Sequence, residues 1–146
     1  MSAEARGPCA PLPPGSVIGI LGGGQLGRMA AQAAAALGYR SHVYCPEADA
    51  PGAQVTPLAT VAAYDDEAAL ARFADSVDLA SYEFENIPLE TVEAVAARVP
   101  VRPGPEVLRI CRNRRREKDF CASLGVPTTA HRSVATPEDL RAAVRE

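Results

Sequence analysis

Residues 22–27, GGGQLG, have the spacing of a turn that binds phosphate. The segment matches the pattern G-x-G-x-x-G, follows the β-branched run SVIGIL and leads into the helix-forming run RMAAQAAAAL. Gly22 would permit a tight bend, Gly24 would let a phosphate approach the backbone, and Gly27 would allow the helix to pack on the strand. The free N–H groups at the helix N-terminus would then face an anion. The functional interpretation is a phosphate-bearing ligand, and the structural alternative is a tight turn without one.

A second polar group follows a later apolar run. Residues 81–88 read SYEFENIP, and alternation places Glu83 and Glu85 on the same side if the chain stays extended. A carboxylate there can accept hydrogen bonds from a ribose hydroxyl or a ligand amine. The alternative is a polar strand end that caps the next helix. Glu47, twenty residues beyond Gly27, is either the ribose-binding acid of an NAD(P) site or a solvent-exposed loop residue.

The third group is basic and lies between residues 109 and 118, in the sequence RICRNRRREK. The apolar stripe of Val107, Leu108 and Cys111 would continue at positions 114 or 115, where arginines stand instead. An arginine on a face that is expected to be buried often binds an anion such as phosphate. The alternatives are a solvated basic helix face and a nucleic-acid patch. The patch is disfavoured because no aromatic residues interleave with the arginines.

The segments that carry these groups alternate between strand and helix patterns. Strands are expected within SVIGIL, YRSHVYC, ATVAAY and VDLASYEF, and helices within RMAAQAAAAL, DDEAALARFA, LETVEAVAARV, residues 106–124 and TPEDLRAAVRE. Gly38 is expected to close the first helix and Thr136 to cap the last. This alternation predicts an α/β fold with right-handed βαβ units around a parallel sheet. Because ligands bind beyond the carboxyl ends of such strands, the glycine and acidic groups are expected to form one site.

Composition excludes several classes of protein. The 146 residues carry a net charge of −3, with 47% hydrophobic and 23% charged residues, which is typical of a soluble globular domain. The acidic balance argues against nucleic-acid binding, and no apolar run is long enough to span a membrane. Four cysteines without C-x-x-C spacing favour a reducing cytosol and indicate no metal site. Residues 1–15 are rich in proline and are expected to form a disordered tail.

The quoted segments together resemble one family. GILGGGQLGRM, YEFENIP and PVRPGPEVL…NRRREKDF…LGVPT are similar to the amino-terminal part of N5-carboxyaminoimidazole ribonucleotide synthetase, an ATP-grasp ligase of de novo purine synthesis. The resemblance covers nearly all of residues 16–146. Its specificity comes from the pairing of the glycine and acidic segments, because G-x-G-x-x-G alone is found in many families.

The resemblance implies a fold and a reaction. Residues 16–120 would form a Rossmann-like, parallel-sheet pre-ATP-grasp domain, and residues 121–146 the start of a truncated ATP-grasp domain. Enzymes of the family carboxylate 5-aminoimidazole ribonucleotide with bicarbonate, using ATP and Mg²⁺. Carboxyphosphate is thought to be the intermediate. It is cytoplasmic and tends to form homodimers. The family's ATP-gripping loop and its Mg²⁺-binding acids would lie beyond Glu146, so the segment alone is expected to be inactive.

The family's binding residues carry over to matching positions. The resemblance implies that the Gln-Leu pair and the first glutamate of the acidic segment hold the ribonucleotide. With the glycines of the turn, the expected ligand-binding set is Gly22, Gly24, Gln25, Leu26, Gly27 and Glu83. The resemblance also implies an ATP contact at Arg114, four residues before Lys118, and no catalytic or metal-binding residue within the chain. Arg112 and Arg115 depart from the family, which commonly has glutamine and leucine there.

Three other functions stay open at this point. A formate-dependent glycinamide ribonucleotide transformylase would share the fold and the layout of the site. An NAD(P)-binding oxidoreductase domain would explain the glycines but not the acidic segment. A non-catalytic nucleotide-binding module would need to be stable as a short chain. The sequence ends within its last expected helix, which argues against this function.

Overall fold

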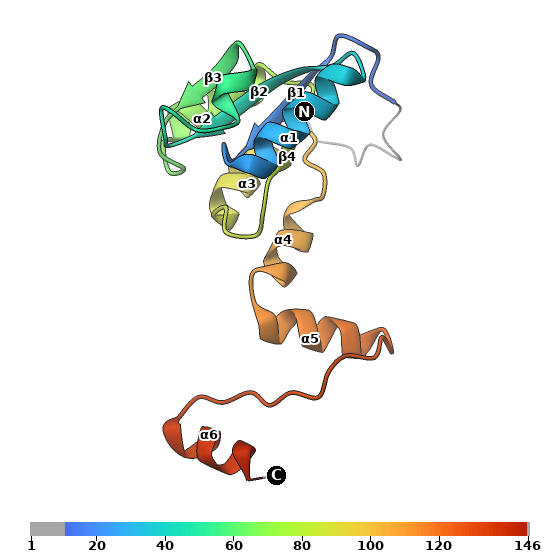
Figure 1. The fold of residues 1–146 in the computed structure, drawn as a ribbon, viewed down its shortest axis with the longest axis vertical. Helices are drawn as coiled ribbons and strands as arrows, with labels where there is room; N and C mark the ends of the chain where they lie inside the picture. The colour runs from blue at the N-terminus through green and yellow to red at the C-terminus, as the bar shows by residue number, and fades with distance from the viewer. Residues whose placement is uncertain (1–10, 146) are drawn as a thin grey trace. The chain divides into compact units, whose positions relative to one another are not determined.

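The computed structural model describes residues 11–145 (Figure 1). The chain divides into two compact units, Met1–Leu108 and Arg109–Glu146. Residues 1–10, which include Cys9 and most of the expected disordered tail, lie outside the described part. The division falls before the expected boundary at residue 120, and the domain limits 16–120 and 121–146 remain predictions. No helix within residues 11–145 is both long enough and apolar enough to cross a membrane.

Four strands form the sheet of the amino-terminal unit. They are β1 (Val17–Leu21), β2 (Arg40–Cys45), β3 (Leu58–Val61) and β4 (Leu79–Tyr82). Their order is β3-β2-β1-β4 and every neighbouring pair is parallel, which confirms the predicted α/β sheet. The strand order reverses between β1 and β4. In open α/β sheets such a reversal opens a crevice at the carboxyl ends of the strands, where ligands bind.

Alternating side chains along β1 pack into two separate cores, one on each face of the sheet. Val17 and Leu21 belong to the larger core, which also holds residues of α2 (Glu67–Asp75) and α3 (Leu89–Ala96). Ile20 belongs to the smaller core on the opposite face, with Ala31 of α1 (Gln25–Ala36) and the short η1 helix (Ala53–Val55). The β1 strand is therefore fixed from both sides, and so is the turn that follows it.

Helix boundaries follow the capping residues that the sequence indicates. Gly38 adopts a φ of +83° just after α1, a conformation that favours glycine. The Asp66 carboxylate accepts a hydrogen bond from the Ala69 amide at 2.9 Å and begins α2. Thr136 and Asp139 form a capping box at the start of α6 (Pro137–Val144). The boundaries at Gly38 and Thr136 confirm the caps predicted from local sequence, and α2 lies within the segment DDEAALARFA that was expected to be helical.

The predicted single helix over residues 106–124 is wrong. The segment forms two helices, α4 (Pro105–Cys111) and α5 (Arg114–Ser123). Asn113 between them is extended, with a φ of −126° and a ψ of 109°, and its side chain accepts a hydrogen bond from the Arg116 amide at 3.1 Å. An asparagine that caps a new helix cannot also continue the preceding one. The apolar stripe that begins at Val107 therefore ends with α4.

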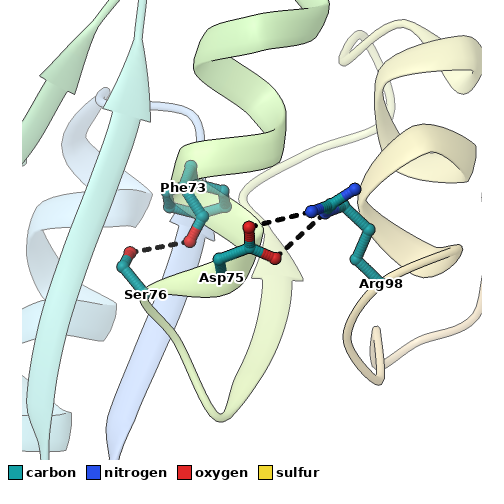
Figure 2. A network of polar contacts seen from close by, with 4 residues as sticks. All are labelled: Phe73, Asp75, Ser76 and Arg98. Carbon is teal, nitrogen blue, oxygen red and sulfur yellow. Dashed lines mark hydrogen bonds and ion pairs between the residues drawn. The ribbon is translucent and has the colours of Figure 1, made fainter.

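Polar contacts hold α2 against the segment that follows α3 (Figure 2). The Arg98 guanidinium donates two hydrogen bonds to the Asp75 carboxylate, at 3.0 and 2.8 Å, and these bonds lower the pKa of Asp75. The Ser76 hydroxyl donates to the Phe73 carbonyl at 2.7 Å and closes the end of α2. The Arg98–Asp75 pair is exposed to solvent, so it orients the two segments more than it stabilises them.

The end of the expected tail is bonded to the amino-terminal unit. The Tyr39 hydroxyl donates to the Leu12 carbonyl at 2.9 Å, and the Gly15 amide donates to the Gly38 carbonyl at 2.8 Å. Residues 12–15 are thus held against the loop that connects α1 to β2.

His42 links three elements of the larger core. Its Nδ1 atom lies 2.8 Å from the Ser76 hydroxyl and its Nε2 atom 2.8 Å from the Thr60 hydroxyl, and its ring packs edge-on against Phe73. Because Ser76 already donates its proton to the Phe73 carbonyl, Nδ1 carries the hydrogen and Nε2 accepts one from Thr60. The neutral ring therefore satisfies both neighbours, and burial lowers the pKa of His42 below its usual 6.5.

We expect the free energy of unfolding to fall as the pH is lowered through 6.5 toward the folded-state pKa of His42. The reason is that the unfolded chain binds a proton at a higher pH than the folded chain does. Urea unfolding between pH 7.5 and pH 5 measures this loss. His42→Gln should show a smaller dependence on pH, whereas His131→Gln, in an exposed loop, should match the unmodified chain. Equal pH dependence in all three proteins would contradict the assignment.

Candidate functional site

A cavity of about 350 Å³ opens beyond the carboxyl ends of the strands. Its lining includes Gly23, Gly24, Glu47, Asp49, Tyr64 and Glu83. The glycines follow β1, the first two acids follow β2, and Glu83 follows β4. The structure thus brings the glycine group and the acidic group together at the point where the strand order reverses. A larger cavity of about 530 Å³ between α2 and α3 includes none of the predicted ligand-binding residues.

The carboxylate of Glu83 lies inside the glycine-rich turn. Its Oε2 atom accepts hydrogen bonds from the Gly24 amide at 2.7 Å and from the Gly27 amide at 3.2 Å. The Glu83 amide itself donates to the Leu21 carbonyl at 3.0 Å, which holds the residue beside the end of β1. Two of the amides that the sequence assigned to a ligand anion therefore already bind an anion of the protein. Sequence reasoning missed this contact because 59 and 56 residues separate the partners.

The positions of the three glycines lie so close to the Glu83 carboxylate that a larger side chain would occupy its space. A Cβ atom added to Gly24 would lie 2.2 Å from Oε1 of Glu83, and one added to Gly27 would lie 2.7 Å from Oε2. Gly22 has a φ of +109°, which other residues rarely adopt, and its added Cβ would lie 2.9 Å from the same side chain. All three glycines of the G-x-G-x-x-G pattern thus surround Glu83.

The loop after β2 forms a second wall of the cavity. The Gly52 amide donates to the Gly23 carbonyl at 2.7 Å, so the loop backbone contacts the glycine turn. Arg28 donates to the Gln54 side-chain oxygen at 3.1 Å, and Gln54 donates to the Asp49 carboxylate at 3.1 Å. This chain of contacts connects the first turns of α1 to an acid that lines the cavity. Sequence reasoning noted Glu47 in this loop but missed Asp49.

Not every residue of the expected set lines the cavity. Gln25 and Leu26 occupy the first turn of α1 with exposed side chains, and within residues 11–145 their amides have no hydrogen-bond acceptor. Glu85 is exposed in a turn, because β4 ends at Tyr82. The extended conformation that would place Glu83 and Glu85 on the same side is therefore not present.

The walls of the cavity are rich in hydrogen-bond acceptors. Glu47, Asp49 and Glu83 contribute carboxylates, and burial followed by the charge of Glu47 raises the pKa of Tyr64. Burial also raises the pKa of the Cys45 thiol, which packs behind Gly23 and stays neutral. A ligand group that fills this space must supply N–H or O–H donors, since the negative charge of the three carboxylates would repel an anionic ligand group.

The basic residues belong to the carboxyl-terminal unit. Arg114 is exposed and pairs with Glu117, and Arg115 pairs with Asp119 at 3.7 Å. Neither arginine lies on a buried face, because the helix breaks at Asn113, so that premise of the anion-site prediction is wrong. A cavity of about 640 Å³ within this unit is nevertheless lined mainly by basic side chains, namely Arg114, Arg115, Lys118, His131 and Arg132, together with the acid Asp139. Sequence reasoning missed His131 and Arg132, which lie on the loop before α6.

Within residues 11–145, no group of three or more His, Cys, Asp or Glu side chains is placed to hold a metal ion.

Comparison with known proteins identifies the family. The profile of the ribonucleotide synthetase preATP-grasp domain matches residues 16–112. The chain belongs to this family. It is 49% identical over 135 residues to the bifunctional purine synthesis protein purC/E of Dictyostelium discoideum, a match that covers 92% of this chain and 14% of that protein. It is 47% identical over 133 residues to the N5-carboxyaminoimidazole ribonucleotide synthase of Brucella melitensis, a match that covers 91% of this chain and 37% of the relative.

Solved structures of the same family share the fold. The Staphylococcus aureus N5-carboxyaminoimidazole synthetase complexed with ADP is 34% identical, with a TM-score of 0.84 over 92% of this chain and 36% of that one. The Aspergillus clavatus N5-carboxyaminoimidazole synthase, in complex with ADP and 5-aminoimidazole ribonucleotide, is 26% identical, with a TM-score of 0.80 over 90% of this chain and 36% of that one. The chain spans about a third of the length of the bacterial and fungal relatives. The comparisons support the synthetase interpretation over the transformylase and the NAD(P)-binding alternatives.

The fit between Glu83 and the turn predicts the effect of filling the last glycine. In Gly27→Ala the new methyl group would lie 2.6 Å from the Gly22 carbonyl oxygen, which is backbone and cannot rotate away. We expect a loss of about 1–3 kcal/mol in the free energy of unfolding. Gly104→Ala is the matched control, because no atom lies within 4 Å of its added Cβ, and it should change stability by less than about 0.5 kcal/mol. Urea unfolding of both variants tests this, and equal losses would count against the tight fit.

Proposed function

We propose that this chain is the amino-terminal part of an ATP-dependent ligase that carboxylates 5-aminoimidazole ribonucleotide with bicarbonate. The product would be N5-carboxyaminoimidazole ribonucleotide, an intermediate of de novo purine synthesis. The observation that carries the proposal is the cavity between β1, β2 and β4, in which the glycine turn and Glu83 meet. Its acceptors suit a ligand with hydroxyl and amine donors, and a relative of the same fold was solved with this ribonucleotide.

The work of this unit would be positioning. Oε1 of Glu83 accepts no hydrogen bond within residues 11–145, so it is available to a ribose hydroxyl or to the exocyclic amine of the ribonucleotide. Gln25 and Leu26 would hold the ligand at the rim, from the first turn of α1. A 5′-phosphate at this turn would find the amides of Gln25 and Leu26, because Glu83 takes those of Gly24 and Gly27. Fixing the amine in one orientation favours its attack on a carboxyl donor.

The carboxyl-terminal unit would contribute to the ATP site. Arg114 matches the family's ATP-contacting arginine, and it lines a cavity with Arg115, Lys118, His131, Arg132 and Asp139. A cluster of guanidinium and ammonium groups suits the phosphates of a nucleotide. We propose that the whole enzyme binds Mg²⁺ and bicarbonate and makes the remaining contacts to ATP, and that this segment alone is inactive. We also propose that the whole enzyme forms a homodimer and is located in the cytoplasm.

Ribonucleotide binding by the 146-residue chain tests the proposal. We expect calorimetric titration to show binding of 5-aminoimidazole ribonucleotide, and Gln25→Ala to weaken it about tenfold through the loss of a side-chain hydrogen bond. Gln32→Ala is the matched control, because Gln32 is also exposed on α1 but lies two turns away from the cavity. Its affinity should equal that of the unmodified chain. No binding, or an equal effect of the two substitutions, would contradict the proposed site.

A further inference from the structure

Within residues 11–145, Glu83 uses one of its two carboxylate oxygens as a hydrogen-bond acceptor. Both hydrogen bonds from the turn, at 2.7 Å from Gly24 and at 3.2 Å from Gly27, end on Oε2. Oε1 accepts none within residues 11–145, and Glu83 lines the cavity. The side chain of Glu83 is half-buried, so water cannot fully replace the hydrogen bonds that its carboxylate makes.

We propose that Glu83 is a positioning residue, which holds the glycine-rich turn through Oε2 and presents Oε1 to the ligand. The turn then uses G-x-G-x-x-G to enclose a carboxylate of the protein rather than a phosphate of the ligand. The first glycine provides the bend, and all three provide the room that the carboxylate occupies. The part of the proposal that concerns Oε1 rests on the proposed function, and the part that concerns Oε2 does not.

The position of Oε2 also makes Glu83 a determinant of specificity. A dinucleotide bound in the usual way would place its pyrophosphate where this carboxylate lies, on the amides at the start of α1. A phosphate and a carboxylate cannot share the Gly24 and Gly27 amides, because like charges at that separation repel. A pyrophosphate is thereby excluded from the Gly24 and Gly27 amides, and only those of Gln25 and Leu26 are left to a ligand phosphate.

Glutamine at position 83 separates the two roles. Its single side-chain oxygen can accept both turn amides, since one oxygen already does so. The two N–H donors fix which end of the amide faces them, so the NH₂ group is directed to the cavity in place of Oε1. Glu83→Gln should therefore keep the turn and lose the ligand acceptor, whereas Glu83→Ala should lose both.

Amide hydrogen exchange of the ¹⁵N-labelled 146-residue chain, followed by NMR, tests the structural role without any ligand. We expect Glu83→Ala to speed exchange at Gly24 and Gly27 by about tenfold, and Glu83→Gln to leave it within about twofold of the unmodified chain. The Val43 amide, at the centre of the sheet, reports whether a variant has unfolded as a whole. Glu85→Ala and Glu85→Gln are matched controls, since Glu85 is exposed two residues away. Unchanged exchange in Glu83→Ala, or equally fast exchange in Glu83→Gln, would overturn the proposal.

Calorimetric titration of the same proteins with 5-aminoimidazole ribonucleotide tests the ligand role. Glu83→Gln should weaken binding about tenfold although its turn amides stay protected, and the Glu85 variants should bind as the unmodified chain does. Protected amides with full affinity in Glu83→Gln would overturn the assignment of Oε1. If the unmodified chain binds no ribonucleotide, the proposed function and the role of Oε1 fail together, and the exchange data still decide whether Oε2 holds the turn.

Discussion

Two hydrogen bonds to one oxygen atom of Glu83 hold the two halves of the site together. The Gly24 and Gly27 amides belong to the start of α1, and Glu83 belongs to the end of β4, so the contact joins segments that the chain order keeps apart. The α1 helix has no side-chain cap of its own, because Gly24 stands at its N-cap position. The carboxylate supplies the missing acceptor and lies at the positive end of the helix dipole. Packing on both faces of β1 then fixes where this pair sits.

The rest of the cavity follows from that arrangement. Because Glu83 occupies the turn, the remaining space lies between it and the loop after β2, where Glu47 and Asp49 stand. The backbone hydrogen bond from Gly52 to Gly23 holds this loop against the glycine turn. Acceptors predominate on its walls, so complementarity favours a ligand rich in donors, as a ribose and an amine are. One of the three carboxylates of the site thus stabilises the turn, and the other two come from the loop after β2.

Local sequence predicted the elements well, and contacts between distant residues explain the differences. Strand and helix periodicity, together with caps such as Gly38 and Thr136, depends on residues within a turn or two, and those predictions are confirmed. The break at Asn113 was also local, but helix-forming neighbours on both sides obscured its capping role. By contrast, the bond from Gly24 to Glu83 spans 59 residues, and Asp49 reaches the cavity only through the folded loop. No periodicity within one segment contains that information.

The glycine pattern illustrates why a motif and its ligand have to be argued separately. In this turn three glycines leave room for an anion beside the start of α1, and such room suits a phosphate and a side-chain carboxylate alike. What distinguishes the two cases is a residue outside the motif. Here the distinguishing residue stands at the end of the strand beside β1, on the other side of the reversal in strand order. In this chain the acid at that place, Glu83, is therefore what fills the glycine turn with a side-chain carboxylate.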